Sequence, residues 1–324
     1  MKAVVYQDFG PPDVLQFSDI EKPSPGDDEV LIQVRAASVN PLDWKMMKGG
    51  PLLFRLMLGM RKGKIKRPGV DVAGEVEAAG KNVTQFKAGD AVFGTCKGAF
   101  AEYGIAKTAT LAIKPEDLTF EEAAAAPVAA LTALQGLRDK GRVRSGQSVL
   151  INGAAGGVGT FAVQMAKSFG ANVTGVCSTK NVDLVRSLGA DRVIDYTQDD
   201  VTAGRGQFDI VLDCVGNHSF SEWRRALRPK GILVGVGASP GVGIARILGG
   251  LIGALVQSLF VSQKFRFFIA KANQDDLIAV GELMAGRKVQ AVIDRRYPLS
   301  EAREAFRYVE QGHARGKVII NPEC

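Results

Sequence analysis

The chain has 324 residues, of which 46% are hydrophobic and 23% are charged, and it contains 38 glycines. At roughly 150 residues per domain this length predicts two domains, and the composition excludes a disordered chain. The 41 Lys and Arg residues outnumber the 34 Asp and Glu residues, for a net charge of +7. This excess suits an anionic small molecule and does not require nucleic acid, so we expect no nucleic-acid partner.

Residues 1 to about 120 are predicted to form a β-rich unit, because short apolar runs alternate with turn clusters rich in Pro and Gly. Glu29–Ser38 alternates apolar and polar residues as a half-buried strand does. Similar runs predict further strands at Gly74–Lys81, Ala91–Gly94 and Phe100–Lys107.

The pattern changes near Thr119, which begins a helix with early acidic residues, and Pro127 begins a second helix that continues to about Lys140. From Ser148 onwards, short apolar strands alternate with amphipathic helices, which predicts a parallel sheet with right-handed crossovers. The predicted strands are Ser148–Asn152, Asn172–Cys177, Arg192–Asp195, Asp209–Asp213 and Gly231–Gly235, and the helices are Gly157–Phe169, Asn181–Leu188 and Ser219–Leu227.

Two segments have alternative interpretations. Ile244–Phe260 is strongly apolar but shorter than the ~20 residues that a membrane span needs; we interpret it as a buried or dimer-facing helix, with a membrane-surface contact as the alternative. Basic and apolar residues alternate along Arg55–Arg67, which fits a solvated loop, a mobile lid or a contact with anionic lipid. The tail predicts a strand, a helix and a strand at Ala291–Tyr297, Ser300–Gln311 and Lys317–Ile320.

The number and spacing of cysteines and histidines disfavour a zinc site. The chain has four cysteines, none close to another in the sequence, and only two histidines. Scattered single cysteines are typical of reduced thiols in a cytosol-like compartment. The N-terminal residues turn polar at Gln7 without an apolar signal core. We therefore predict a cytoplasmic protein without a metal.

The strongest motif is a glycine-rich turn after the predicted strand Ser148–Asn152. Glycines stand at 153, 156 and 159, and a helix follows. Such a turn is tight, lets the backbone approach a pyrophosphate without interfering Cβ atoms, and lets the free N–H groups of the helix start face the phosphate. Because a strand, a helix and further strand–helix units surround the glycines, we predict a dinucleotide-binding turn.

The end of the next strand distinguishes the two nicotinamide dinucleotides. NAD sites usually carry an Asp or Glu about 20 residues after the glycine turn, which binds the ribose 2′-OH. Here the residues after Cys177 are Ser178, Thr179 and Lys180, which offer hydroxyls and a cation and no carboxylate. Lys180 would pair with a ribose 2′-phosphate, although Ser178 and Thr179 also suit the cap of the next helix. We therefore predict NADPH as the cofactor.

Further motifs are spread over nearly the whole chain. They are 40–45 (NPLDWK), 69–76 (GVDVAGEV), 89–94 (GDAVFG), 130–133 (ALTA), the glycine turn, 188–191 (LGAD), 194–196 (IDY) and 312–317 (GHARGK). With these motifs the chain resembles the zinc-independent quinone oxidoreductase family of the medium-chain dehydrogenase/reductase superfamily.

The resemblance implies an α/β fold of two domains. Residues 1–122 and 287–324 would form a GroES-like catalytic domain, and residues 123–286 a Rossmann NADP-binding domain with a doubly wound parallel sheet. Zinc-containing relatives place a Cys near Asn40–Asp43 and a His-Glu pair where this chain has Val70 and Asp71, so the catalytic zinc would be absent here.

The resemblance also implies the cofactor contacts. The glycine turn would meet the pyrophosphate, Ser178, Lys180 and Tyr196 the 2′-phosphate end, and Asn40 and Thr132 the nicotinamide ribose. The basic residues near the C-terminus would close over the cofactor. The complete set is Asn40, Thr132, Gly153, Ala154, Gly156, Gly157, Val158, Ser178, Lys180, Tyr196, Cys214, Val215, Gly235, Val236, Gly237, Phe268, His313, Arg315 and Lys317.

Without a metal, an electron-poor acceptor is the easier substrate, because hydride from NADPH can add to a quinone ring or to the β-carbon of an α,β-unsaturated carbonyl. Negative charge then develops on an oxygen that needs a donor. Asn40 or the cofactor ribose could donate there, water, Lys45 or Tyr103 could supply the proton, and Asp43 would order the turn at Asn40.

Two alternative functions remain open at this point: a non-catalytic NADPH-binding sensor or partner-binding protein, and an alcohol or aldehyde dehydrogenase of the same superfamily. We expect a homodimer, on the resemblance and on the apolar segment Ile244–Phe260.

Overall fold

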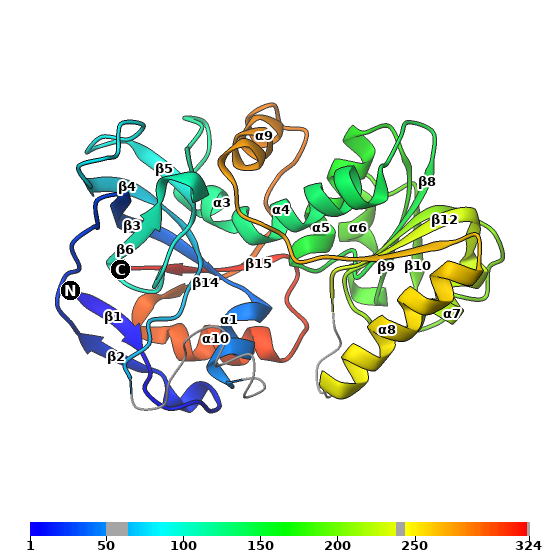
Figure 1. Cartoon of the computed structure of the whole chain (residues 1–324), viewed down its shortest axis with the longest axis horizontal. Coiled ribbons are helices and arrows are strands. Elements are labelled where there is room, and N and C mark those ends of the chain that lie inside the picture. Colours follow the sequence, from blue (N-terminus) through cyan, green and yellow to red (C-terminus); the bar gives the residue numbers. More distant parts are fainter. Residues whose placement is uncertain (50–63, 238–243, 323–324) are drawn as a thin grey trace. The chain divides into compact units, whose positions relative to one another are not determined.

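The computed structural model describes residues 1–49, 64–237 and 244–322 of the chain. The chain divides into two compact units, whose elements are labelled in Figure 1. The first unit is Met1–Leu131, Ala272–Arg287 and Ala291–Cys324, and the second is Thr132–Lys271 with Lys288–Gln290.

The boundaries of the units differ from those expected from the sequence. Residues 123–131 and 272–286, which we assigned to the Rossmann domain, make their contacts in the first unit. Helix α9 (Gln274–Ala285) packs on strand β7 (Leu111–Ile113) of that unit. The sequence does not reveal which sheet these segments pack against, and this is why the predicted boundaries fall elsewhere.

The first unit is built on a seven-stranded sheet in the described part of the chain, with the order β14-β15-β3-β4-β5-β7 and with β6 also pairing with β3. The long strand β3 organises it, because β4 pairs along most of its length, β6 with its first half and β15 with its end. The strands are β3 (Glu29–Val39), β4 (Asp71–Ala79), β5 (Ala91–Thr95), β6 (Tyr103–Lys107), β7, β14 (Ile293–Pro298) and β15 (Lys317–Asn321).

Short helices and a hairpin complete this unit. The predicted helix start at Thr119 is confirmed: Thr119 Oγ1 accepts from the Glu122 N–H at 3.2 Å, and the Glu122 carboxylate accepts from the Thr119 N–H at 2.8 Å. In the core, the rings of Phe100 and Phe306 meet edge to face at 5.6 Å. The remaining elements are the hairpin β1 (Lys2–Val5) and β2 (Gln16–Asp19), α1 (Pro41–Met47), α3 (Phe120–Ala125), α4 (Pro127–Gln135, which continues into the second unit) and α10 (Ala302–Glu310).

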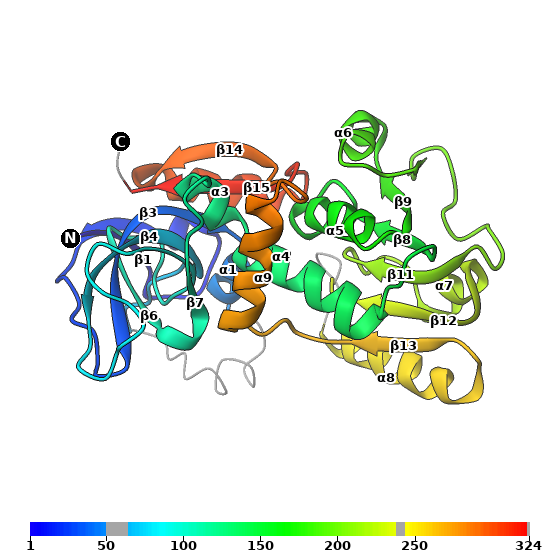
Figure 2. The same cartoon turned by 90° about the horizontal axis from the view of Figure 1, so that it is seen from above.

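The second unit contains a six-stranded parallel sheet among its described residues, with the order β10-β9-β8-β11-β12-β13. Helix α5 lies on one face of this sheet and α7 on the other (Figure 2), so the sheet is doubly wound, as predicted. The elements are η3 (Gly136–Gly141), β8 (Ser148–Asn152), α5 (Gly157–Ser168), β9 (Asn172–Cys177), η4 (Thr179–Asn181), α6 (Val182–Ser187), β10 (Arg192–Asp195), β11 (Phe208–Asp213), α7 (Phe220–Ala226), β12 (Leu227–Gly235), α8 (Ile244–Phe260) and β13 (Lys264–Phe267).

The apolar segment Ile244–Phe260 forms helix α8. Among the described residues, no helix has the length and apolar character to cross a membrane. The part of the basic run Arg55–Arg67 up to residue 63 lies outside the described residues.

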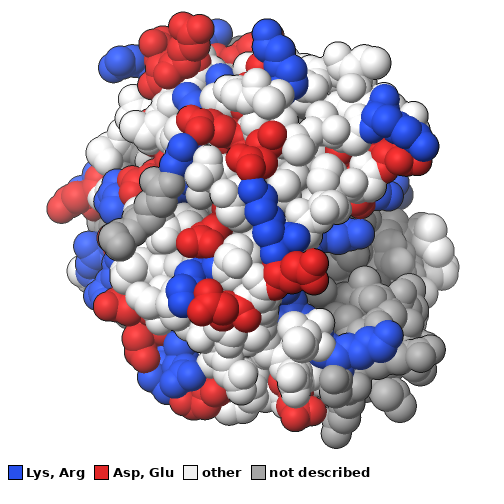
Figure 3. Space-filling model, turned by 90° about the vertical axis from the view of Figure 1, so that its left-hand side faces the viewer, with Lys and Arg blue, Asp and Glu red and all other residues white. Residues whose placement is uncertain are grey.

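Basic and acidic side chains are interspersed on the described surface in Figure 3. The net charge of +7 is therefore not gathered into one continuous basic field on that face. A continuous basic stripe is the usual electrostatic footprint of a nucleic-acid-binding protein.

Candidate functional site

The glycine turn between β8 and α5 has the backbone that the sequence predicts. Gly153 has a φ of +81°, which an L side chain rarely adopts. A Cβ on Gly159 would lie 2.0 Å from the Gly153 carbonyl oxygen, so only glycine lets the start of α5 pack on the turn. A Cβ on Gly156, the N-cap of α5, would meet only that oxygen, at 3.4 Å. The helix start therefore faces open space and fits a phosphate group held by backbone N–H groups.

Two further loops emerge at the same edge of the sheet, because the strands are parallel and in register. Asn152 at the end of β8 is paired with Asp213 at the end of β11, and Asp213 with Gly235 at the end of β12. The strand order reverses between β8 and β11, which is the kind of place where open α/β sheets bind ligands. The structure thus brings together the glycine turn and the loops that begin at Cys214 and Val236.

Asp213 fixes these loops. It is 4% exposed, and its carboxylate accepts from Asn152 Nδ2 at 2.8 Å, from the N–H groups of Val215 and Gly216, and from Trp223 Nε1 at 3.0 Å. Its backbone carbonyl accepts from the N–H groups of Val236 and Gly237. Sequence reasoning missed this residue, although an acid at the end of an apolar strand is a visible signal.

The candidate 2′-phosphate residues follow β9 and β10. These strands pair so that Cys177 lies opposite Asp195, and the Tyr196 N–H donates to the Cys177 carbonyl at 3.1 Å. Ser178 is half-buried, Lys180 is exposed and Tyr196 is 58% exposed. The structure therefore brings the loops that carry Ser178 and Tyr196 to neighbouring strand ends.

One buried acceptor in this loop has no partner among the described residues. Asn181 is 9% exposed; its Nδ2 donates to Ser178 Oγ at 3.3 Å, and its Oδ1 is left without a donor. An unsatisfied buried acceptor next to Ser178 is a feature that a hydroxyl of a bound ligand would satisfy.

Thr132 and Phe268 lie on other elements of this unit. Thr132 is half-buried on α4. Phe268 follows β13, and its ring lies 3.6 Å from the position of a Cβ on Gly136 and 5.7 Å from Lys140 Nζ. Because β13 is parallel to β12, Phe268 leaves the sheet at the same edge as Val236.

The first unit contains a buried cluster of polar side chains where β3, β4 and β15 meet the start of α1. Asp71 accepts from Ser38 Oγ at 2.9 Å, from Asn40 Nδ2 at 2.9 Å and from the Val128 N–H at 3.0 Å. Lys317 Nζ donates to Asn40 Oδ1 at 2.6 Å and lies 3.3 Å from Asp71 Oδ2. We call Ser38, Asn40, Asp71 and Lys317 the buried cluster.

This cluster is an ion pair held away from water. Asp71 is 0% exposed and Lys317 is 3% exposed, so the ammonium and the carboxylate compensate each other in a low-dielectric interior. Asp43 lies beside it as the third residue of α1, where it accepts from the Asn40 N–H at 2.8 Å. Burial raises the pKa of Asp43 to about 7, and the neighbouring Asp71 adds to this effect.

The structure shows where four of the predicted residues lie, and their roles toward cofactor and substrate stay predictions. Of the three basic residues expected to close over the cofactor, Lys317 is buried in the cluster, whereas His313 and Arg315 are exposed on the turn before β15. The strand begins at Lys317, which turns this side chain inward. Asn40, expected to donate to the substrate oxygen, has both ends of its carboxamide bound within the cluster.

The catalytic candidates Lys45 and Tyr103 lie outside the cluster. Lys45 is exposed on α1. Tyr103 lies opposite Gln33 on β3, five residues before the Ser38 that pairs with Asp71, which is about 17 Å along a strand. Its ring instead faces Lys22 Nζ at 3.9 Å. The structure therefore does not bring Tyr103 to the buried cluster.

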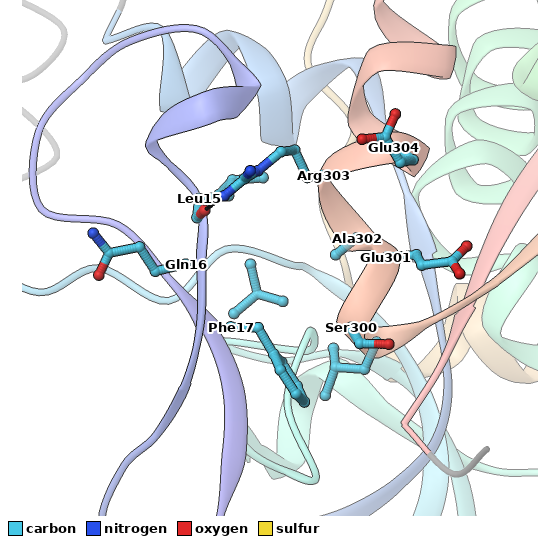
Figure 4. A pocket seen from close by; sticks show the side chains of 10 residues that line it. Leu15, Gln16, Phe17, Ser300, Glu301, Ala302, Arg303 and Glu304 are labelled. Atoms are coloured by element: carbon cyan, nitrogen blue, oxygen red, sulfur yellow. Dashed lines mark hydrogen bonds between the residues drawn. The ribbon is translucent and has the colours of Figure 1, made fainter.

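A small cavity of the first unit contains none of the predicted site residues. Its volume is about 280 Å³, and it lies between the hairpin residues Leu15–Phe17 and the region that begins at Leu299 (Figure 4). Arg303 crosses it to donate to the Leu15 carbonyl at 2.7 Å.

The chain resembles known proteins over both units. Residues 26–116 match the model of the alcohol dehydrogenase GroES-like domain, and residues 188–320 match that of the zinc-binding dehydrogenase. In the ranges that the structure describes, no group of three or more His, Cys, Asp or Glu side chains is arranged to hold a metal ion.

Individual relatives match nearly end to end. The chain is 34% identical to the quinone-oxidoreductase homolog, chloroplastic, of Spinacia oleracea, covering 99% of this chain and 98% of the relative. It is 34% identical to the NADPH-dependent alkenal/one oxidoreductase, chloroplastic, of Arabidopsis thaliana, covering 99% and 80%. Among solved structures, the quinone oxidoreductase from Coxiella burnetii superimposes with a TM-score of 0.87 at 32% identity, covering 99% of both chains.

Proposed function

This chain belongs to the quinone oxidoreductase family of the medium-chain dehydrogenase/reductase superfamily, and we propose that it is a zinc-independent reductase that transfers hydride from NADPH to a quinone or to the C=C bond of an α,β-unsaturated carbonyl. As a member of this family it is an oxidoreductase that uses a nicotinamide cofactor. The acceptor class and the preference for NADPH go beyond membership of the family.

The proposal rests on three loops at the edge of the parallel sheet where the strand order reverses, between β8 and β11. The glycine turn offers a helix start open to a phosphate. Asp213 holds the neighbouring loops at Cys214 and Val236 in place. Residues Ser178, Lys180 and Tyr196 stand at the ends of the next two strands. This arrangement suits a dinucleotide whose far end carries an additional phosphate.

The buried cluster supports chemistry without zinc. Its cation is the ammonium of Lys317, which lies against Asn40 and Asp71. A divalent ion at the same carboxylate would stand beside this ammonium, and two buried cations at such distances repel each other. The reduced nicotinamide supplies the hydride when it is bound. The substrate oxygen then needs a proton, for which water, Lys45 and Tyr103 are the candidates; partial burial of the Lys45 side chain lowers the pKa of its ammonium, which favours donation.

A panel of acceptors tests the function. The purified protein is mixed with NADPH and separately with quinones, α,β-unsaturated carbonyls, saturated aldehydes and, with NADP⁺, alcohols, and the cofactor absorbance is followed. We expect NADPH oxidation with quinones or unsaturated carbonyls and none with saturated aldehydes. Tight NADPH binding without turnover would favour a sensor or partner-binding protein, and turnover of alcohols alone would favour an alcohol dehydrogenase; either result contradicts the proposal.

We also propose a homodimer formed through helix α8. Among the side chains of α8 that the structure describes, the exposed apolar residues are spaced as one helical stripe: Ile252, Leu255, Val256, Leu259 and Phe260, the last two 76% and 83% exposed. The opposite side is buried, with Ala254 at 6% exposure in the core of the unit. A stripe of this kind on a surface usually marks an interface.

A second copy of the chain is the occupant we favour. Strand β13, next after α8 in the chain, is the edge of its sheet among the described strands, and an edge strand offers hydrogen-bonding groups that an identical strand would complement. Light scattering is expected to give a mass near twice the 34.5 kDa of the chain. Replacing Leu259 by Lys puts a charge into the apolar stripe, and the variant should have the mass of one chain. A monomeric wild type that binds anionic liposomes would contradict the dimer and favour a membrane-surface contact.

A further inference from the structure

A carboxylate lies beside the proposed 2′-phosphate residues. Asp195 ends β10, directly opposite Cys177 at the end of β9, so its side chain stands between the loop of Ser178 and Lys180 and the loop of Tyr196. A carboxylate beside a ribose 2′-position would ordinarily favour a hydroxyl there and repel a phosphate. The role of Asp195 therefore depends on what its oxygens bind.

Both oxygens of Asp195 are occupied by neutral donors. Oδ1 accepts from the N–H of Thr197 at 3.0 Å and from its Oγ1 at 2.8 Å. Oδ2 accepts from Thr179 Oγ1 at 2.6 Å and from Gln198 Nε2 at 3.2 Å. These contacts engage both oxygens of the carboxylate, so a ribose hydroxyl would have to displace one of them. The hydrogen bond from Thr179, above all, holds the pKa of Asp195 below its usual range.

The same contacts connect the two loops. Thr179 belongs to the loop after β9, between Ser178 and Lys180, and Thr197 follows Tyr196 in the loop after β10. Within the described ranges no ion pair joins Lys180 to Asp195, because hydroxyl and amide donors satisfy the carboxylate instead. The ammonium of Lys180 is thus left for another anion.

We propose that Asp195 is a positioning residue that sets the preference for NADPH over NADH, by holding the loop of Ser178 and Lys180 against the loop of Tyr196. The inference rests on the proposed function, since it takes these three residues to be the 2′-phosphate contacts. A purely electrostatic role predicts the opposite sign: removing a negative charge beside a phosphate would tighten NADPH binding.

The test compares Asp195→Asn and Thr179→Val with the wild type by calorimetry. The probes are NADPH, NADH and 2′,5′-ADP, which carries the 2′-phosphate without a nicotinamide. Asp200→Asn is the matched control, because Asp200 accepts from the N–H and Oγ1 of Thr202, both at 2.8 Å, as Asp195 does from Thr197. Lys180→Glu is the positive control, since it places a negative charge against the 2′-phosphate.

We expect Asp195→Asn and Thr179→Val to weaken binding of NADPH and 2′,5′-ADP by about tenfold, the effect of one charge-assisted hydrogen bond, with NADH binding unchanged. Asp200→Asn should bind all probes as the wild type does. Three results for Asp195→Asn would overturn the inference, provided that Lys180→Glu still discriminates between the two cofactors. They are unchanged NADPH binding, tighter NADPH binding, and an equal loss of affinity for NADPH and NADH. If the wild type shows no preference for NADPH, or Lys180→Glu weakens both cofactors alike, the proposed cofactor site fails together with the inference.

Discussion

Replacing Lys317 by Met is expected to lower the free energy of unfolding by about 3–5 kcal/mol, the usual cost of leaving one member of a buried ion pair alone. Asp71 is fully buried, and in this variant its carboxylate would retain the hydrogen bonds from Ser38, Asn40 and Val128 but lose its compensating cation. Asn40 Oδ1 would also lose its donor. Urea unfolding followed by circular dichroism measures the change.

A second substitution separates the ion pair from simple packing. In the double variant Lys317→Met with Asp71→Asn no charge of the pair remains, so most of the lost stability should return. Lys167→Met is the exposed control: Lys167 pairs with Asp191 at the surface, and a change of about 1 kcal/mol or less is expected. A Lys317→Met protein as stable as the control, or a double variant no more stable than the single one, would refute the pairing.

Replacing Gly159 by Ala is expected to weaken NADPH binding by about a hundredfold, because the glycine turn has no room for a Cβ. The added atom would lie 2.0 Å from the Gly153 carbonyl oxygen and 2.7 Å from Ala154 Cα, and both are backbone atoms that cannot swing aside. Forced repacking of this kind costs about 1–3 kcal/mol, which corresponds to one or two factors of ten in affinity. Calorimetry with NADPH gives the affinity.

Gly156 provides the comparison for this variant. A Cβ there would make only an ordinary contact, at 3.4 Å, with the Gly153 oxygen, so Gly156→Ala should fold as stably as the wild type. The same Cβ would stand over the open helix start that we assign to the phosphate, and NADPH binding should still weaken. Wild-type affinity of Gly159→Ala for NADPH would mean that the turn does not hold the cofactor. Wild-type affinity of Gly156→Ala would mean that the phosphate is bound elsewhere.

The dinucleotide turn could be predicted from the sequence because its determinants are local. Strand β8 and the glycines that follow it lie within about a dozen consecutive residues, and the predicted bounds Ser148–Asn152 are those observed. The same holds for Thr119 and Glu122, whose reciprocal hydrogen bonds span three residues. Here the tight turn and the capping box constrain the backbone without help from distant segments.

The buried cluster could not be predicted in this way. Lys317 and Asn40 are 277 residues apart and meet only because β15 pairs with the end of β3. From the sequence, Lys317 was one of several basic residues near the C-terminus, and nothing local distinguishes it from the exposed Arg315. Strand β15 is buried from its first residue, Lys317, whereas Arg315 lies on the exposed turn before it.

The missed elements are short or weakly patterned. Helix α1 has 7 residues and strand β13 has 4, lengths over which periodicity carries little information. Helix α9 did carry a local signal, since Asn273 accepts from the Asp276 N–H at its start. Its membership of the first unit depends on its packing against β7, which no local pattern encodes.

The account depends most on direct transfer of hydrogen from the bound nicotinamide to an electron-poor acceptor. The most direct measurement uses NADPH carrying deuterium on the transferred position, with a quinone and an α,β-unsaturated ketone as separate acceptors, and mass spectrometry of the products. We expect a hydroquinone from the quinone, or a saturated ketone with one deuterium on its β-carbon. A protein that binds NADPH yet yields neither product, or a saturated ketone free of deuterium, would contradict the account.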